Sequence, residues 1–343
     1  MNKKITLIGK NQNELEEYCV ANNFPKFHGE QLFRWLYKNN HLDLNKMNNI
    51  PKKLKEKINS ECEISLLKIE NQSISKIDKT IKFLLKTNDN KLVESVSMID
   101  KKRHTVCISS QIGCNVDCDF CATGKMGIDR NLNVGEIIEQ LIIVKKNTSV
   151  PITNIVFMGM GEPFLNYRNV IESCKIFTNH KAFNLGTKRI TISTAGVLPQ
   201  IDLFIKEKHK YKLALSLNAP NDLIRDKIMP INKKWNISDL ISSLKKYDFF
   251  KTRVIMFEYV LLKGINDSIE NAKELSKLLK NIQCKVNLIP FNQISGIYKR
   301  SDNKTINNFA DILNKHNIRV LIRWSKGEDI DAACGQLATN HES

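Results

Sequence analysis

From about residue 104 onward, the hydrophobic positions alternate between two patterns. Short runs rich in β-branched residues predict strands, and amphipathic segments with apolar residues at helical spacing lie between most of them. The predicted strands cover 105–111, 154–160, 189–194, 212–217, 253–262, 285–291 and 318–324, and the clearest helices cover 134–144, 269–279 and 305–313. Repeated strand–helix units predict an α/β fold with a parallel sheet, either an open doubly wound sheet or a complete or partial barrel.

The first 90 residues have a different pattern. Apolar residues at i, i+3 and i+4 predict a helix over 27–37, and Pro51 can open a second, lysine-rich helix. The segments 81–86 and 92–96 predict strands joined by a turn at 88–90. This region is predicted to be either a basic RNA clamp or a plain packing domain.

The composition sets the size and environment of the protein. With 343 residues, 42% of them hydrophobic, the chain can bury a large core, and we expect an accessory domain over 1–90 and a second domain over 91–343. No apolar run approaches the roughly 20 residues that span a bilayer. The first residues lack the apolar stretch of a signal peptide. We therefore expect a cytoplasmic protein without membrane contact, and nothing indicates that it is other than a monomer.

The chain is strongly basic, with a formal net charge of +17. Such a charge attracts polyanions, and nucleic acid is the first candidate. Lys, Asn and Ile are abundant throughout, so a general bias in composition can account for part of the charge.

Three of the nine cysteines form a tight cluster, C-x3-C-x2-C, at Cys114, Cys118 and Cys121. Three thiolates on one loop can hold a metal centre, and on a [4Fe-4S] cluster they would leave one iron open for catalysis. A zinc site with a distant fourth ligand, or three buried thiols, are the alternatives. The odd number of cysteines argues against a disulfide framework and for a reducing compartment.

Polar or glycine-containing motifs follow several of the predicted strands. In a parallel sheet these strand ends meet at one rim, where ligands bind. Besides the cysteine loop, the motifs lie at 159–163, 193–196, 216–220 and 290–292.

The cysteine loop also resembles a known signature. An aromatic residue, Phe120, precedes Cys121, as in radical S-adenosylmethionine (SAM) enzymes, and S-S-Q-I-G-C-N-V-D-C-D-F-C-A-T-G is similar to the 23S rRNA adenine methyltransferases of the RlmN and Cfr type. The resemblance continues through G-M-G-E-P-F-L-N-Y, R-I-T-I-S-T-A-G, M-P-I-N-K-K, F-E-Y-V-L-L-K-G-I-N-D, V-N-L-I-P-F-N and G-E-D-I-D-A-A-C-G-Q-L. It implies a radical SAM partial (βα)6 TIM-like barrel preceded by a small N-terminal accessory domain.

The resemblance also implies roles for individual residues. The cluster cysteines bind [4Fe-4S], and Gly161 and Glu162 contact the methionine end of SAM. The rest of SAM is expected to contact Ser193, Ser216, Leu217, Asn218 and Asn292. The sequence departs from the family pattern at Asn218, where His is usual, and at Gln293, where Pro is usual; Trp324 lies in a stretch where the family varies.

The implied chemistry needs two more cysteines. C2 of adenine is not nucleophilic, so in this family one SAM methylates a cysteine, here Cys334, and a second SAM supplies a radical that activates the methyl group. Glu94 is expected to accept the C2 proton, and attack by Cys107 on Cys334 releases the product with a Cys107–Cys334 disulfide. The implied substrates are adenosine 2503 of 23S rRNA and adenosine 37 of tRNAs, with an electron donor such as flavodoxin.

Two alternatives remain open from the sequence. A Cfr-like enzyme would methylate C8 of the same rRNA adenosine, although G-E-P and L-I-P-F-N favour C2. A non-enzymatic iron–sulfur protein that binds RNA or senses redox state would have no use for Cys107 and Cys334.

Overall fold

The structure, a computed structural model, describes residues 4–246, 254–294 and 296–339. Its centre is a ten-stranded sheet with the strand order β14-β13-β12-β11-β10-β9-β6-β5-β4-β3. Seven neighbouring strands are parallel: β6 (Arg103–Cys107), β9 (Asn154–Phe157), β10 (Ile190–Thr194), β11 (Lys212–Ser216), β12 (Ile255–Leu261), β13 (Cys284–Pro290) and β14 (Arg319–Ile322). The described sheet ends at β14 on one side and β3 on the other, so the predicted parallel α/β sheet is confirmed in an open form.

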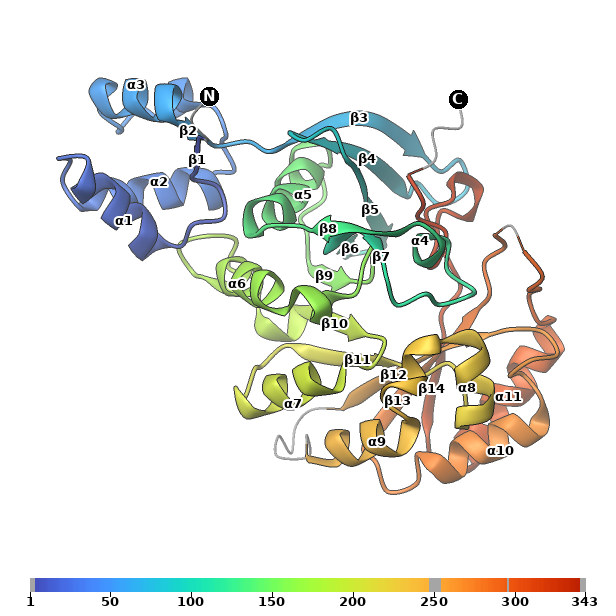
Figure 1. Cartoon of the computed structure of the whole chain (residues 1–343). Helices are drawn as coiled ribbons and strands as arrows, with labels where there is room; N and C mark the ends of the chain where they lie inside the picture. The colour runs from blue at the N-terminus through green and yellow to red at the C-terminus, as the bar shows by residue number, and fades with distance from the viewer. Residues whose placement is uncertain (1–3, 247–253, 295, 340–343) are drawn as a thin grey trace.

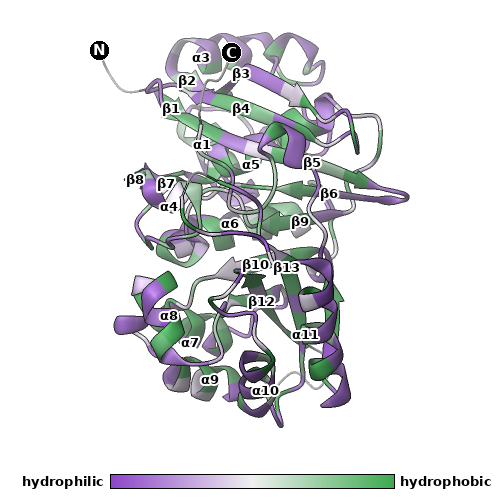
Figure 2. Ribbon diagram, turned by 90° about the vertical axis from the view of Figure 1, so that its right-hand side faces the viewer, coloured by the Kyte–Doolittle hydropathy of each residue, from purple (hydrophilic) through white to green (hydrophobic). Residues whose placement is uncertain are grey.

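Helices connect the parallel strands and cover the sheet (Figure 1). They are α5 (Val134–Lys146), α6 (Tyr167–Thr178), α7 (Leu198–Lys206), α8 (Asp222–Ile228), α9 (Ile237–Lys245), α10 (Ile269–Leu278) and α11 (Asn303–Lys315). Most begin at an Asn, Asp or Ser whose side chain accepts from a backbone N–H of the first turn, as Asn133 does for α5. Figure 2 shows hydrophobic residues concentrated in the strands, while polar residues colour the outer helices. None of the helices in the described ranges is both long and apolar enough to cross a membrane.

An antiparallel extension joins the parallel strands at β6. It consists of β3 (Leu67–Ile74), β4 (Ile81–Thr87) and β5 (Leu92–Asp100), with the predicted turn between β4 and β5. The turn that joins β3 to β4 holds the C-terminal segment: the Lys76 amide donates to Asp329 (3.0 Å) and the Gly327 amide donates to Asp78 (2.9 Å). The extension therefore positions the segment that carries Cys334.

The N-terminal helices lie together at one end of the molecule (Figure 1). They are α1 (Gln12–Ala21), α2 (Phe27–Tyr37) and α3 (Lys52–Glu61), beside the short paired strands β1 (Ile5–Thr6) and β2 (Cys62–Glu63). The helix predicted over 27–37 is confirmed, and Pro51 precedes α3 as predicted. The expected boundary near residue 90 falls in the turn between two paired strands, β4 and β5; the division into 1–90 and 91–343 stays a prediction.

The strand predicted over 105–111 is wrong in its second half. β6 ends at Cys107, and Gln111 begins a separate hairpin of β7 (Gln111–Cys114) and β8 (Gly127–Asn131). In between, the backbone still bonds to the segment at and after β9, because the Ile108 amide donates to the Val156 carbonyl (2.9 Å) and the Ser110 amide to the Met160 carbonyl (2.9 Å). The Ser109 amide donates instead to the Gln140 side chain (2.8 Å), and its hydroxyl donates to the Glu94 carbonyl. Of the strand predicted over 253–262, residue 253 lies outside the described residues.

Candidate active site

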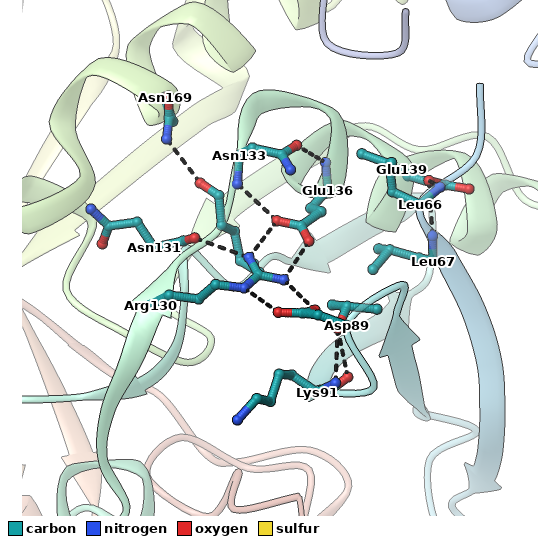
Figure 3. A network of polar contacts seen from close by, with 12 residues as sticks. Leu66, Leu67, Asp89, Lys91, Arg130, Asn131, Asn133, Glu136, Glu139 and Asn169 are labelled. Carbon is teal, nitrogen blue, oxygen red and sulfur yellow. Dashed lines mark hydrogen bonds and ion pairs between the residues drawn. The ribbon is translucent and has the colours of Figure 1, made fainter. Parts of the chain in front are cut away.

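Arg130 anchors the hairpin that carries the cysteines. Its guanidinium binds both carboxylate oxygens of Asp89, each at 2.8 Å, and both of Glu136, at 2.7 and 2.9 Å (Figure 3). The first carboxylate belongs to the β4–β5 turn and the second to the start of α5, so one cation ties three elements together. The same contacts lower the pKa of Asp89.

The three cysteines of the predicted cluster line one cavity of about 170 Å³. Cys114 ends β7, Cys121 is the N-cap of the short helix α4 (Ala122–Lys125), and Cys118 lies on the loop between them. The loop returns close to α4 at Gly124, where a Cβ atom would lie 3.0 Å from the Cys118 carbonyl oxygen. The sequence thus brings together three thiols that are four and three residues apart.

The surroundings of these thiols fit a cofactor with positive charge. Burial raises the pKa of Cys114 to about 12 and also raises the pKa values of Cys118 and Cys121, so the free thiols hold their protons. The guanidinium of Arg225 opposes this effect at Cys118. Bound metal ionises such thiols. Within the described ranges no three His, Cys, Asp or Glu side chains converge on a single ion, whereas a cluster binds each thiolate at a different iron.

Glu162 lines the same cavity as the three cysteines. This side chain is only 4% exposed, and burial raises its pKa to about 7. Its carboxylate accepts from the backbone amides of Ala195 (2.7 Å) and Phe164 (2.9 Å), which fixes its position at the end of β10. Gly161 must be glycine here: its φ is +91°, and a Cβ atom would lie 2.4 Å from Cβ of Gln111.

Ser193, Ser216 and Asn218 line the same cavity from the ends of β10 and β11. The two serine hydroxyls lie 3.4 Å apart. Asn218 has a φ of +57°, a conformation that Asn adopts more readily than most residues, and its carboxamide oxygen accepts from the Val260 amide (2.9 Å). Leu217 differs: it is fully buried and its amide donates to the Glu258 carbonyl, so only its backbone supports the rim.

A buried arginine holds the backbone of this rim by hydrogen bonds. Arg225 is 0% exposed and donates to the carbonyls of Ala195 (2.6 Å) and Leu217 (3.0 Å) and to the side chain of Asn232 (2.8 Å). Burial lowers its pKa to about 10. One side chain therefore fixes the loops after β10 and β11 relative to each other.

Cys334 lies between two cavities. It lines the cavity of the cluster cysteines and also a second cavity of about 330 Å³ that contains Cys107. Burial, followed by the nearby Cys334, raises the pKa of Cys107 to about 12. Arg323 lines the second cavity as well, and Cys334, Glu258 and Cys107 together raise the pKa of its guanidinium. The structure thus brings the two predicted catalytic cysteines together.

Two predicted site residues, Asn292 and Glu94, contact the C-terminal segment. Asn292 donates from its carboxamide to the Cys334 carbonyl (2.9 Å) and is absent from the lining of the cluster cavity. Glu94 is buried in β5, where it pairs with Lys82 (3.1 Å) and accepts from the amides of Ala338 (2.9 Å) and Thr339 (3.2 Å). Both residues hold the C-terminal segment in place.

Sequence reasoning missed Glu258 as a site residue. It lines the cluster cavity and is 4% exposed; one carboxylate oxygen accepts from Asn287 (2.8 Å), while the other has no hydrogen-bond partner among the described residues. Such an orphaned acceptor fits a cavity that receives a polar ligand. The available signal was an isolated Glu in the apolar strand F-E-Y-V-L-L.

Comparison with known proteins gives consistent matches. Residues 108–276 match the radical SAM superfamily, and residues 5–64 match the ribosomal RNA large subunit methyltransferase N-terminal domain. The chain is 47% identical over 350 residues to the dual-specificity RNA methyltransferase RlmN of Wigglesworthia glossinidia brevipalpis, covering 99% of this chain and 91% of that protein. It is 43% identical over 344 residues to the RlmN of Vesicomyosocius okutanii subsp. Calyptogena okutanii, covering 98% and 96%.

A solved structure matches the whole fold. The crystal structure of a radical SAM methyltransferase from Sphaerobacter thermophilus superposes with a TM-score of 0.94 at 39% identity, covering 98% of this chain and all of that one. The expected fold class, a radical SAM α/β fold with an N-terminal accessory domain, is thereby confirmed.

Proposed function

The chain belongs to the RlmN family of radical SAM RNA methyltransferases, and we propose that it methylates C2 of adenosine 2503 in 23S rRNA and of adenosine 37 in tRNAs. Membership of the family implies SAM and a [4Fe-4S] cluster as cofactors and RNA as the substrate. Most of the residues proposed to carry out the reaction line the two cavities, whereas Glu94 and Asn292 line neither.

The cofactors belong in the smaller cavity. Cys114, Cys118 and Cys121 would hold the cluster, and Gly161 and Glu162 would bind the methionine end of SAM beside it. Ser193 and Ser216 offer hydroxyls to the remainder of SAM, while Asn218 and the backbone of Leu217 shape the rim. Asn292 lies next to this site and donates a hydrogen bond to the Cys334 carbonyl.

The position of Cys334 carries the proposal. Its sulfur can take a methyl group from SAM in one cavity and present it to a base in the other, because its side chain lines both. A bound cluster and SAM together supply the radical that removes a hydrogen atom from this methyl group. Glu94 accepts the C2 proton once the carbon is bonded to the base, and the cluster that Cys114, Cys118 and Cys121 would hold would take up the one electron that this addition leaves on the base.

Cys107 then separates protein from RNA. Its thiolate attacks the Cys334 sulfur, the S–S bond forms as the C–S bond breaks, and the electron pair stays with the carbon, which takes up a proton as the new methyl group. Cys107 lies in the cavity that Cys334 also lines, within reach of this step. Each turnover uses two SAM molecules, and a reductant such as flavodoxin supplies electrons to a monomeric enzyme in the cytoplasm.

Purified, reconstituted protein tests the proposal. With SAM, a reductant and an unmodified 23S rRNA fragment, nucleoside mass spectrometry should detect 2-methyladenosine, and the Cys334→Ala variant should give none. 8-Methyladenosine would instead support the Cfr-like alternative. Absence of 5'-deoxyadenosine under these conditions would support a non-enzymatic iron–sulfur protein.

A further inference from the structure

The larger cavity extends along the parallel strands, from residues at their amino-terminal ends to residues at and beyond their carboxyl ends. Its wall includes Arg103, the first residue of β6, and Thr191 and Met256, the second residues of β10 and β12. Cys107, the last residue of β6, also lines it, as does Cys334. The cluster cysteines and the serine rim, in contrast, lie at the carboxyl ends. The methyl-carrying residue can therefore be approached from two cavities.

Cations gather at the amino-terminal ends of these strands. Burial and the neighbouring charges of Arg103, Lys285, Arg189 and Lys188 lower the pKa of Lys212. Burial, Arg323 and Arg189 likewise lower the pKa of Arg103. None of the five residues Arg103, Lys188, Arg189, Lys212 and Lys285 forms an ion pair with a carboxylate in the parts of the chain that the structure describes. One carboxylate, Asp100, acts on Arg103, and it is itself paired with Lys326 (3.6 Å). This excess of mutually repelling cations favours a polyanionic partner.

An aromatic side chain lies at the same cavity. Trp324 follows β14, lines the cavity and is 48% exposed. The guanidinium of Arg300 lies 5.5 Å from its ring centroid and is itself held by Glu328 at 3.1 and 3.2 Å. A large indole that is half exposed yet held in place is a stacking surface of the kind that binds unstacked bases of RNA.

The chemistry of the reaction requires such a surface. A base must leave its stack to reach a sulfur inside the protein, and its neighbours then lose a stacking partner. We propose that RNA docks over the larger cavity, where Trp324 stacks on a nucleotide next to the target adenosine, while Arg103, Arg189 and Lys212, at the amino-terminal ends of their strands, bind the flanking phosphates. This inference rests on the proposed function for the identity of the target base; the docking face follows from the cavity and its charges.

Binding of a fluorescently labelled RNA stem–loop that contains the target adenosine tests the docking face, with the reconstituted enzyme and fluorescence anisotropy as the readout. Loss of one stacking contact should weaken binding about tenfold in Trp324→Ala, whereas Trp324→Phe should stay within about threefold. Trp235→Ala is the matched control, since Trp235 also lies under a cation, Lys234, but belongs to another surface. Its RNA affinity should equal that of the wild type.

Variants that remove positive charges distinguish RNA binding at this face from RNA binding at the N-terminal helices. The combined Arg103→Ala, Arg189→Ala and Lys212→Ala variant should reduce the slope of log affinity against log salt by about 2 to 3. The control removes three lysines of α3, Lys52, Lys53 and Lys55, and should change the slope less. SAM affinity should stay constant in all variants.

Two results would overturn the docking face: wild-type RNA affinity in Trp324→Ala, or a larger change of the salt slope in the α3 control than in the combined Arg103, Arg189 and Lys212 variant. Failure of the proposed function would look different. In that case the wild-type enzyme would leave the adenosine unmodified, whatever face the RNA occupies.

Discussion

The carboxamide of Asn292 donates a hydrogen bond of 2.9 Å to the main-chain carbonyl of Cys334. Asn292 lies two residues beyond Pro290, the last residue of β13, and its carboxamide oxygen has no partner among the described residues. The contact links the rim of the sheet to the segment that carries the sulfur between the two cavities. Asn292 is therefore a positioning residue for Cys334 in this structure.

Replacement of Asn292 by Ala should slow methyl transfer more than it weakens SAM binding. Loss of one hydrogen bond of about 1 kcal/mol predicts a fivefold slower transfer, because Cys334 is then held less firmly. SAM affinity, measured by equilibrium dialysis, should change less than twofold. An equal loss in both quantities would mean that Asn292 acts mainly on SAM, as the family resemblance implies.

Release of the RNA should depend on pH through Cys107. Burial raises the pKa of this thiol to about 12, so at neutral pH only a small fraction is the attacking thiolate. Below the pKa, the thiolate fraction grows tenfold for each unit by which the pH rises. Release of a preformed protein–RNA adduct should therefore accelerate about tenfold per pH unit between roughly pH 7 and 9.

Rapid-quench samples on denaturing gels measure this rate. Cys107→Ala should hold the adduct at every pH, which provides the control. Release at a constant rate across this range would rule out deprotonation of Cys107 as the controlling step.

Glu94 offers a way to separate positioning from proton transfer. Gln in its place keeps the shape and one acceptor for the Ala338 and Thr339 amides, but a neutral amide cannot accept the C2 proton. The Glu94→Gln variant should therefore accumulate the RNA adduct on denaturing gels. Lys82→Met, which removes the partner of Glu94, is the control and should still release product. Wild-type release by Glu94→Gln would leave Glu94 with a positioning role only.

Arg225 should be needed for stability as well as for the rim. Arg225→Leu removes the donors to Ala195, Leu217 and Asn232 and leaves these buried acceptors unpaired. We expect a loss of about 3 kcal/mol in the free energy of unfolding and a melting temperature several degrees lower, measured by circular dichroism. The melting temperature of Arg225→Lys should fall between those of the wild type and Arg225→Leu. An unchanged melting temperature in Arg225→Leu would show that other contacts fix these loops.

Local patterns explain what could be predicted from the sequence. Strand and helix periodicities are set within a few residues, and the cysteine spacing lies on one loop; these features gave the parallel sheet and the three thiols of the cluster cavity. The strand predicted over 105–111 is wrong beyond Cys107, where Ser109 bonds to Gln140 and Glu94, residues distant in the chain. The pattern of a few neighbouring residues cannot predict such contacts.

The remaining site features depend on residues far apart in the chain. Glu94 meets Ala338 across 244 positions, and Asn292 meets Cys334 across 42. The orphaned oxygen of Glu258 and the contacts of Arg225 likewise depend on how neighbouring strands are aligned. Motif spacing could suggest that these residues matter, but it could not supply their partners.

The central claim is that Cys334 carries the methyl group to C2 of adenosine in both RNAs. The most direct measurement is nucleoside mass spectrometry of 23S rRNA and tRNA from cells that have the gene, lack it, or carry Cys334→Ala. We predict that 2-methyladenosine disappears from both RNAs without the gene and is restored by the wild type but not by the variant. Unchanged 2-methyladenosine in the deletion strain, or its restoration by Cys334→Ala, would contradict the account.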